Sequence, residues 1–518
     1  MRQVGEIDGI DVSDASRSLW YATAEVDEFP ALEGDIEVDV AVIGAGITGV
    51  TVAHLLKREG KSVALLEMRR VGVGTTGNTT AKLTVGHSLV YAKLSSSHGP
   101  DAARLYAESN REAISQMDAL VADLGIDCDW EPASNYVYTE SSGRLDKLED
   151  ELEAMRSAGI LAEMTRETDL SFPVAGAVRV DEQAQFHPLK YLAGLVARIP
   201  GDGGHVFEQT RATGVKSGET AIVQTTSGRV LARHVVVATQ LPFLDRGLFF
   251  AKAHPQKSFV VSAEMEEARA PRGMYISIDE PTRSIRSAPS GDGNRQLIVG
   301  GESRRPGDEQ NDKYAYQALD EFMRAEFGVA SELHWSAHDY IPADGLPYIG
   351  RLRRGDERLH VATGFAKWGL TKGTIAARII TDAIVGRKNP WAALYDTRRW
   401  TPRASAKSLA AENGRVARRF VADRIRPRSA GEQLAPGEGA VIRDGLGHQA
   451  VYRDESGNTH VLSARCPHLG CLVAWSEADR TWECPCHGSR FTAEGGLLQG
   501  PATTGLALRE SPEPAADS

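Results

Sequence analysis

A short glycine-rich segment near the N-terminus restricts the fold of this chain more than any other feature. Gly44, Gly46 and Gly49 directly follow an apolar run at residues 38–42 and stand at the start of a helical pattern, VTVAHLLKREG. A second apolar run, SVALLE, comes next. Two parallel strands joined by a helix require this order of segments. The sequence therefore predicts a β-α-β unit in an α/β domain with a parallel sheet.

The spacing of these glycines has a physical meaning. In the pattern G-x-G-x-x-G, the first glycine permits a tight turn, the second lets the backbone approach a diphosphate, and the third allows close packing of helix and strand. Glu67 ends the second strand, 18 positions after Gly49, where a carboxylate can accept hydrogen bonds from a ribose 2′-hydroxyl. We therefore expect these four residues to bind a dinucleotide without a 2′-phosphate. A glycine turn with no ligand is the alternative.

A second match to the glycine pattern, at Gly72, Gly74 and Gly77, follows the residues MRRV. That segment is too short and too basic for a buried strand, so we interpret the region as a loop. Its polar side chains could donate hydrogen bonds to a cofactor, and the candidates are Thr75, Thr76 and Thr80. A plain surface loop is the alternative.

Three segments resemble the flavin-binding elements of the D-amino acid oxidase/glycine oxidase family. They are VDVAVIGAGITGVTVAHLLKREGKSVALLE, ARHVVVATQLPF and DGLPYIG followed by LHVATGFAKWGLTKG, within residues 36–390. The resemblance implies FAD, with the flavin ring beside Gly364, Lys367, Trp368 and Gly369. It also implies an oxidoreductase that acts on CH–NH or CH–NH2 groups by hydride transfer to flavin N5. Packing and solvated charge are the alternative roles of Lys367 and Trp368.

The same resemblance suggests where a substrate would bind. Arg286, Tyr340 and Tyr348 fall in stretches that border the substrate cavity of family members, and an arginine could bind a carboxylate through two parallel hydrogen bonds. Together with Lys367 they are the catalytic candidates, and the favoured alternative for Arg286 is plain exposure. The loop GTTGNTTAKLT departs from the serine- and arginine-containing version common in the family, so the resemblance does not fix the substrate.

Four of the five cysteines fall within 21 positions near the C-terminus. A tight cluster with interleaved histidines indicates a metal site rather than a disulfide scaffold. Cys466 and His468 form one pair, Cys484 and His487 form another, and 15 residues separate the pairs. Two such loops can converge on one [2Fe–2S] cluster, with thiolates on one iron and imidazoles on the other. Zinc is the alternative, although a classical finger would place its cysteines together and its histidines together.

The whole pattern resembles the Rieske family, in the subgroup of bc-type complexes, over residues 433–508. The resemblance implies that Cys471 and Cys486 form a disulfide that ties the two loops together. A dithiol is the alternative in a reducing compartment. The resemblance also implies a hydrogen bond from Ser489 to a bridging sulfur. Phe491 stands where the members of highest potential carry a tyrosine, and a phenyl ring cannot donate that bond.

These patterns divide the chain into five parts. We expect a polar N-terminal arm that packs on the main body, an oxidoreductase domain with interleaved FAD-binding and substrate parts, a linker helix, a small Rieske domain and a disordered tail. Their ranges are 1–34, 35–397, 398–432, 433–508 and 509–518. The expected fold class is α/β, with a Rossmann-like domain, followed by all-β.

Composition and charge indicate which partners and which cellular compartment to expect for this protein. The net charge of −11, from 59 basic and 70 acidic residues, argues against nucleic acid as a partner. Long apolar runs and a secretory pattern at the N-terminus are absent from the sequence, so we expect a cytoplasmic protein without a transmembrane segment. We interpret Cys128 as a buried apolar residue and His187, which precedes a proline, as a helix-entry residue.

The two modules together predict a redox enzyme with FAD and a [2Fe–2S] cluster. FAD would take two electrons from a small organic substrate. The cluster, with His468 and His487 on its solvent side, would pass them singly to an acceptor protein or a quinone. The alternatives are a plain oxidase with a structural or regulatory Rieske module, and a redox sensor or electron-transfer protein without its own turnover. An NAD(P)H-dependent reductase is less favoured because the sequence offers no second credible dinucleotide unit.

Overall fold

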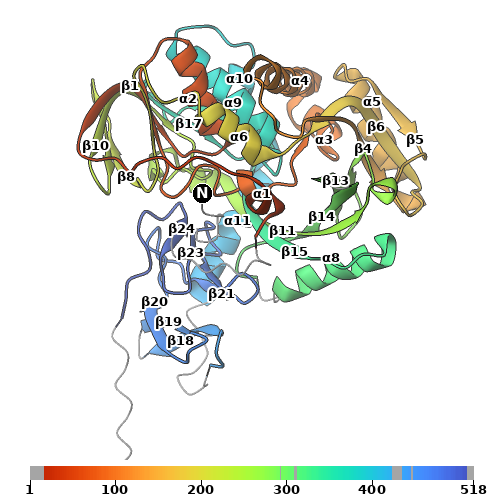
Figure 1. Ribbon diagram of the computed structural model, residues 1–518. Helices are drawn as coiled ribbons and strands as arrows, with labels where there is room; N and C mark the ends of the chain where they lie inside the picture. Colours follow the sequence, from red (N-terminus) through yellow and green to blue (C-terminus); the bar gives the residue numbers. More distant parts are fainter. Residues whose placement is uncertain (1–16, 292, 309–311, 423–433, 445–446, 510–518) are drawn as a thin grey trace, which may run out of the picture.

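The computed structural model describes residues 17–291, 293–308, 312–422, 434–444 and 447–509. Residues 1–16 of the predicted arm, residues 423–432 of the predicted linker and residues 510–518 of the predicted tail lie outside the described residues. A large domain, residues 17–397, and a C-terminal domain, residues 434–509, lie side by side, and α11 (Pro402–Ala422) runs between them in the chain (Figure 1). None of the helices in these ranges is long and apolar enough to cross a membrane.

A mainly parallel sheet forms the half of the large domain that contains the glycine motif. β1 (Ile36–Ile43) pairs in parallel with β2 (Val63–Leu66) on one side and β10 (Arg229–Val237) on the other. α2 (Ile47–Arg58) connects β1 to β2, as the β-α-β pattern predicts. The strand order is β16-β17-β10-β1-β2-β7, and a β8–β9 hairpin extends from β10. The other bounds are β7 (Gly204–Phe207), β8 (Ala212–Lys216), β9 (Ala221–Thr225), β16 (Tyr348–Arg351) and β17 (Leu359–Thr363).

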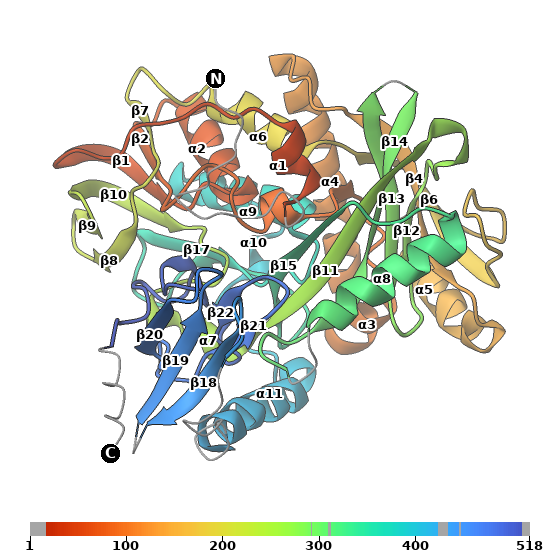
Figure 2. The same ribbon diagram turned by 60° about the horizontal axis from the view of Figure 1, so that its bottom comes forward.

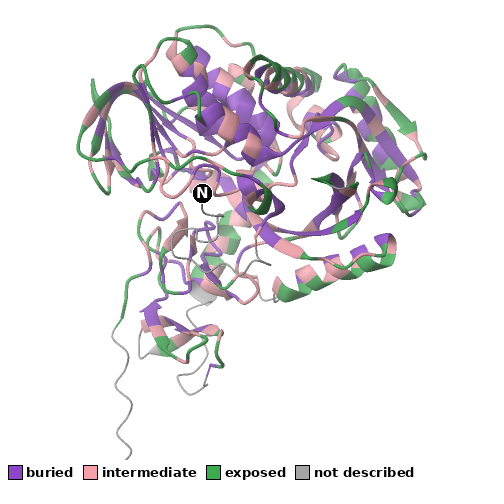
Figure 3. Ribbon diagram, viewed as in Figure 1, coloured by how far each residue is buried: buried purple, intermediate pink, exposed green. Residues whose placement is uncertain are grey.

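The position of β1 inside the parallel sheet explains its apolar run. Strands of parallel sheets are covered on both faces, so they are apolar along their whole length. Val40, Ala41 and Val42 are fully buried. α2 packs against α9 (Gly369–Ile384), and Figure 3 shows both helices buried beside the strands. The other helices of the large domain are α1 (Leu19–Thr23), α3 (Val90–His98), α4 (Pro100–Leu124), α5 (Leu145–Ser157), α6 (Pro188–Val196), α7 (Phe249–Lys252), α8 (Asp312–Phe327) and α10 (Ala392–Tyr395).

A nine-stranded mixed sheet forms the other half of the large domain. Its order is β15-β11-β14-β13-β12-β4-β6-β3, with β5 beside β6, and α8 packs on β11 and β14 (Figure 2). The chain passes repeatedly between this sheet and the parallel one, so the two are interleaved as expected. The bounds are β3 (Lys82–Leu83), β4 (Glu131–Thr139), β5 (Ala162–Thr165), β6 (Gly176–Gln185), β11 (Ala253–Glu266), β12 (Met274–Ser277), β13 (Arg283–Gly291), β14 (Asn294–Arg304) and β15 (Leu333–Pro342).

The C-terminal domain consists of two small antiparallel sheets, as the short strands in its sequence predict. One has the order β18-β19-β20 and the other β21-β22-β23-β24. The expected cluster loops connect β20 to β21 and β22 to β23. The bounds are β18 (Gly439–Asp444), β19 (Gly447–Arg453), β20 (Thr459–Ser463), β21 (Ala474–Ser476), β22 (Thr481–Glu483), β23 (Arg490–Phe491) and β24 (Leu497–Gln499).

Candidate functional site

The glycine turn after β1 has the geometry that diphosphate binding requires. Gly44 has a φ of +100°, and a Cβ there would lie 2.6 Å from the carbonyl oxygen of Ala238. A Cβ at Gly49 would lie 1.8 Å from the carbonyl oxygen of Gly44, so the third glycine permits the close packing of helix and turn. A Cβ at Gly46 would meet only the hydroxyl of Thr76, at 3.2 Å. The second glycine therefore leaves the helix N-terminus open to a ligand.

A cavity of about 480 Å³ begins at this turn and runs between the two sheets. Its volume is in the range of typical cofactor and ligand pockets. Glu67 lines it and accepts hydrogen bonds from the main-chain nitrogens of Ala45 and Arg69, at 2.9 and 3.0 Å. Gly49 and Gly364 are not among the residues that line the cavity. The expected cofactor residues that do line the cavity are Gly44, Gly46, Glu67, Thr75, Thr76, Thr80, Trp368 and Gly369.

The loop at residues 71–80 is a wall of the cavity rather than a plain surface loop. The hydroxyl of Thr76 accepts a hydrogen bond from the main-chain nitrogen of Ile47, at 3.1 Å, and so ties the loop to α2. The N-terminal arm supports the loop from behind through α1, a short helix that the polar sequence of the arm did not predict. The indole of the buried Trp20 donates to the carbonyl of Thr79, at 2.6 Å, and the hydroxyl of Ser18 donates to the carbonyl of Gly77.

A buried lysine lines the far part of the cavity. Lys82 is 6% exposed, and its amine donates to the carbonyl of Tyr275, at 2.8 Å, and to the hydroxyl of Ser284, at 2.6 Å. No carboxylate pairs with this amine within the described ranges. Burial, with the charge of Arg286, lowers the pKa of Lys82 to about 7. An unpaired amine in this setting can accept an anionic ligand or exchange a proton near neutral pH.

Aromatic rings and a second lysine surround the same region. Trp368 stacks on the imidazole of His87, with ring centroids 4.4 Å apart, and the Lys82 amine lies 5.8 Å from the centroid of the indole. Lys367 lines the cavity, and its amine donates to the hydroxyl of Ser303, at 2.6 Å. This end therefore combines flat apolar surfaces with two amines, a combination that suits a flavin ring and a small polar substrate.

Arg286, Tyr340 and Tyr348 do not line the cavity. Arg286 is buried rather than exposed, and its guanidinium donates to the carbonyl of Ala81, at 2.6 Å, and lies 5.5 Å from the ring centroid of Trp20. Tyr348 packs under the guanidinium of Arg399, 4.0 Å from the ring centroid. Tyr340 faces the C-terminal domain. Their positions support roles in packing and domain contact, and give no support to the expected substrate contacts.

The four expected cluster ligands converge between the two loops of the C-terminal domain. The thiols of Cys466 and Cys484 are buried and within hydrogen-bonding contact of each other. The imidazoles of His468 and His487 lie with ring centroids 4.9 Å apart. The Nδ1 atom of His468 is buried and has no hydrogen-bond partner. Two free thiols, two imidazoles and an unsatisfied ring nitrogen fit a [2Fe–2S] cluster with mixed ligands.

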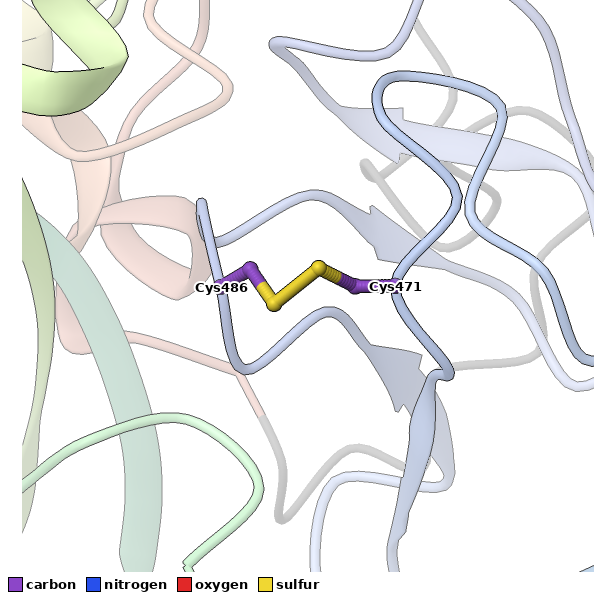
Figure 4. The surroundings of a disulfide bond; sticks show 2 residues. All are labelled: Cys471 and Cys486. Carbon is purple, nitrogen blue, oxygen red and sulfur yellow. A yellow bond between two sulfur atoms is a disulfide. The ribbon is translucent and has the colours of Figure 1, made fainter. Parts of the chain in front are cut away.

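The two remaining cysteines of this region form a disulfide. Cys471 and Cys486 are joined across the loops, as Figure 4 shows, so the dithiol alternative is not the form present here. The sulfur atoms of these residues and Cys484 also lie within 4.8 Å of one another. Disulfide sulfurs carry no thiolate, so that trio is not a separate metal site. Cys128, by contrast, is free and buried far from the cluster in sequence, as the sequence indicated.

Ser489 and Phe491 both lie in the interior of the C-terminal domain. The hydroxyl of Ser489 accepts a hydrogen bond from the main-chain nitrogen of Ala502, at 3.0 Å, so its own proton remains available for a sulfur acceptor. Phe491 is fully buried in the apolar core that also includes Cys466 and Cys484. This environment is consistent with the roles that the Rieske resemblance implies for residues 489 and 491.

The imidazole end of the cluster site faces the large domain. Phe250 makes edge contacts with the rings of both His468 and His487, with centroids 5.9 and 5.5 Å apart. The phenol of Tyr340 donates to the carbonyl of His487, at 2.7 Å. The two histidines, expected on the solvent side of the cluster, are therefore covered by the large domain in this structure. The C-terminal domain also contributes Leu497, Leu498, Gln499, Gly500, Ala502 and Thr503 to the lining of the cavity.

A buried ion network holds the two domains together. Lys257 of the large domain is fully buried, and its amine lies 2.7 Å from Asp479 and 2.8 Å from Glu483 of the C-terminal domain. The same amine lies 2.6 Å from Asp312 at the start of α8. Arg490 pairs with Asp479, at 3.0 Å. Buried charges need such partners, so the contact is specific to this docked arrangement.

Comparisons with known proteins agree with this architecture. The model of the FAD dependent oxidoreductase family matches residues 39–383, and that of the Rieske [2Fe-2S] domain matches residues 429–510. YhfW of Bacillus subtilis (strain 168), named for a Rieske 2Fe-2S iron-sulfur centre, is 34% identical over 94% of this chain and 96% of its own. Gamma-glutamylputrescine oxidoreductase of Escherichia coli (strain K12) is 25% identical over 71% and 89%. Glycine oxidase from Geobacillus kaustophilus superposes with a TM-score of 0.59 at 20% identity, over 70% of this chain and 99% of that one.

Proposed function

Because the chain belongs to the FAD-dependent oxidoreductase family and ends in a Rieske [2Fe–2S] domain, we propose that it oxidises a small amine or amino acid and passes the electrons singly to an acceptor. When bound, FAD supplies a two-electron hydride acceptor and the cluster a one-electron carrier. The residues of this chain supply the binding, the orientation and the electrostatics.

One strand that contacts both sites carries this proposal. In β15, the carbonyl of His338 accepts a hydrogen bond from the hydroxyl of Thr75, at 2.9 Å, on the loop that lines the cavity. Two residues later, Tyr340 donates to the carbonyl of His487. The imidazole of His338 also contacts the carbonyl of Gly488, at 3.3 Å. The cavity and the cluster site are therefore adjacent, as transfer of electrons between them requires.

The unpaired amine of Lys82 supports a substrate with an anionic group. A carboxylate would complete the hydrogen bonding of this amine and offset the cost of its burial. The relatives named for glycine and gamma-glutamylputrescine support a nitrogen-bearing substrate. The proposed substrate is accordingly an amino acid or an amine that bears a carboxylate.

The experiment separates the two cofactors. We expect Cys484→Ser and His487→Ala to remove the iron and to retain FAD, measured by absorbance and by iron analysis. Substrate should still bleach the flavin in both variants under anaerobic conditions, while turnover with a one-electron acceptor falls sharply and slow reoxidation by oxygen survives. Cys128→Ser is the matched control, because it removes a cysteine from the large domain and should keep the iron.

Each rival function predicts a different result. Turnover of the one-electron acceptor at the parental rate in both cluster-free variants would favour a structural or regulatory Rieske domain. An absence of flavin bleaching with every amine, amino acid and NADH tested would favour a redox sensor without its own turnover.

A further inference from the structure

A short segment of the large domain covers the imidazole end of the cluster site. The segment lies between β10 and β11 and contains η4 (Asp245–Gly247) followed by α7. Phe250 closes over His468 and His487 from this segment. The side chains of both histidines are only 4% exposed, although imidazole ligands at the end of a small domain would face water if that domain stood alone.

Asp245 makes a direct polar contact with one of these imidazoles. Its Oδ1 atom lies 2.9 Å from Nε2 of His468, 223 positions away in the chain. Nδ1 of the same ring is buried without a hydrogen-bond partner. A neutral imidazole carries one proton, and here the carboxylate fixes that proton on Nε2. Nδ1 then presents its lone pair, which is the form that a metal needs.

We infer that Asp245 is a positioning residue of the large domain that orients His468 and makes the cluster harder to reduce while the two domains are docked. A carboxylate that accepts from the outer nitrogen of a ligating imidazole increases the basicity of the ligand. A negative charge beside the site also disfavours the reduced cluster, because that state is the more negative one. The inference rests on the Rieske domain holding its cluster and not on the identity of the substrate.

The expected effect is moderate. The side chain of Asp245 is 51% exposed, so water screens its charge. We expect removal of the charge to shift the equilibrium for one-electron reduction by up to about tenfold, which corresponds to about 59 mV. The shift should be toward the reduced state, so the midpoint potential should rise.

The test measures the potential and not turnover. Asp245→Asn and Asp245→Glu are prepared as full-length holoprotein, and the midpoint potential is taken from a redox titration followed by the EPR signal of the reduced cluster. We expect Asp245→Asn to raise the potential and Asp245→Glu to keep it near the parental value. Glu477→Gln is the matched control, because it also removes one carboxylate and one domain contact, the ion pair with Lys313.

The outcomes are distinct. An unchanged potential in Asp245→Asn with full iron content would overturn the inference, and so would an equal shift in Glu477→Gln. If Asp245→Asn loses iron, the exchangeable proton on the ligand imidazole is compared in the parent and in Asp245→Glu by electron–nuclear double resonance. Asp245→Glu keeps the charge but moves the carboxylate by one methylene, so a proton coupling that changes in Asp245→Glu and stays parental in Phe250→Ala would support the carboxylate as the orienting group. A proton coupling that is the same in the parent, in Asp245→Glu and in Phe250→Ala would refute the inference. Failure of the proposed electron path would leave all of these measurements unchanged.

Discussion

The phenol of Tyr340 donates a hydrogen bond to the main-chain carbonyl of His487, 2.7 Å away, and thereby joins the large domain to the loop that carries an expected iron ligand. Burial raises the pKa of Tyr340 well above its ordinary value, so the hydroxyl stays protonated and remains a donor. Tyr340→Phe leaves the carbonyl buried and unsatisfied. We expect it to lower the free energy of unfolding by about 1–3 kcal/mol, measured by denaturant unfolding of the holoprotein. Tyr191→Phe is the control, because the Tyr191 hydroxyl is buried without a hydrogen-bond partner; equal losses in both variants would contradict the expectation.

Lys257 should be the most sensitive residue of the domain interface. Lys257→Met removes the cation from a buried group of three carboxylates, and breaking such a pair typically costs about 3–5 kcal/mol. Thermal and denaturant unfolding measure the loss. Lys313→Met removes an exposed ion pair across the same interface and should cost less than about 1 kcal/mol. Similar losses in the two variants would show that the buried network does not govern docking.

The contribution of this network should depend on pH. Burial acts to raise the pKa of Asp479, but the charges of Lys257 and Arg490 overcome that effect and lower it to about 2. A depressed folded-state pKa stabilises the protein above the ordinary value of 3.8, and the stabilisation disappears as pH falls toward 2. The difference in unfolding free energy between the parent and Lys257→Met should therefore be constant near neutrality and should narrow below about pH 4. A difference that is constant down to pH 3 would contradict this assignment.

Titration of Lys82 in the free enzyme should produce a descending limb in the plot of kcat/KM against pH. Because burial lowers its pKa to about 7, the amine is charged below that pH and neutral above it, so kcat/KM for an anionic substrate should fall above pH 7. Lys82→Arg should remove this limb, and Lys82→Met should lower kcat/KM by about 10- to 100-fold. Lys372 has a similarly lowered pKa, also about 7, but does not line the cavity, so the limb should survive in Lys372→Met. Loss of the limb there would assign it to Lys372.

Phe491 offers a test of the cluster environment. Phe491→Tyr places a hydroxyl in the apolar core beside Cys466 and Cys484, where it can donate to a sulfur. A hydrogen bond to a cluster sulfur stabilises the reduced, more negative state, so the midpoint potential should rise. Ser489→Ala should lower it for the same reason. An unchanged potential in Phe491→Tyr, with folding and iron content intact, would show that residue 491 does not point at the cluster.

Local patterns were sufficient to predict the β-α-β unit and the cluster loops. The three glycines and Glu67 meet the steric and hydrogen-bonding requirements of a dinucleotide-binding turn, so they occur at a fixed spacing in the sequence. The two cysteine–histidine pairs meet the requirements of a cluster site in the same way. His187 is a further example, because the proline after it suits a helix start, and its ring accepts from the main-chain nitrogen of Lys190 at the start of α6.

Contacts between distant segments could not be predicted in this way. In the sequence, Lys82 looks like one more polar residue of a loop. Its amine is buried in contact with β12 and β13, about 200 positions away in the chain, and it has no carboxylate partner among the described residues. Arg286 reads as exposed because its neighbours are polar, yet it is buried beneath Trp20 of the arm. Asp245 and His468 carry no shared periodicity that would indicate their contact. For this reason, the residues of the substrate region and of the domain interface could not be predicted from the sequence.

The closed contact around Phe250 has a consequence for the biosynthesis of the protein. Cys466, Cys484 and the two histidine side chains are almost completely buried once the domains have docked, which restricts the access of iron and sulfide to them. The large domain is synthesised first and can fold and acquire its flavin while the C-terminal domain is still emerging. We expect the cluster to be inserted in the short interval before docking. Iron starvation should then yield yellow, flavin-loaded protein that later addition of iron restores only after the domain contact has been loosened.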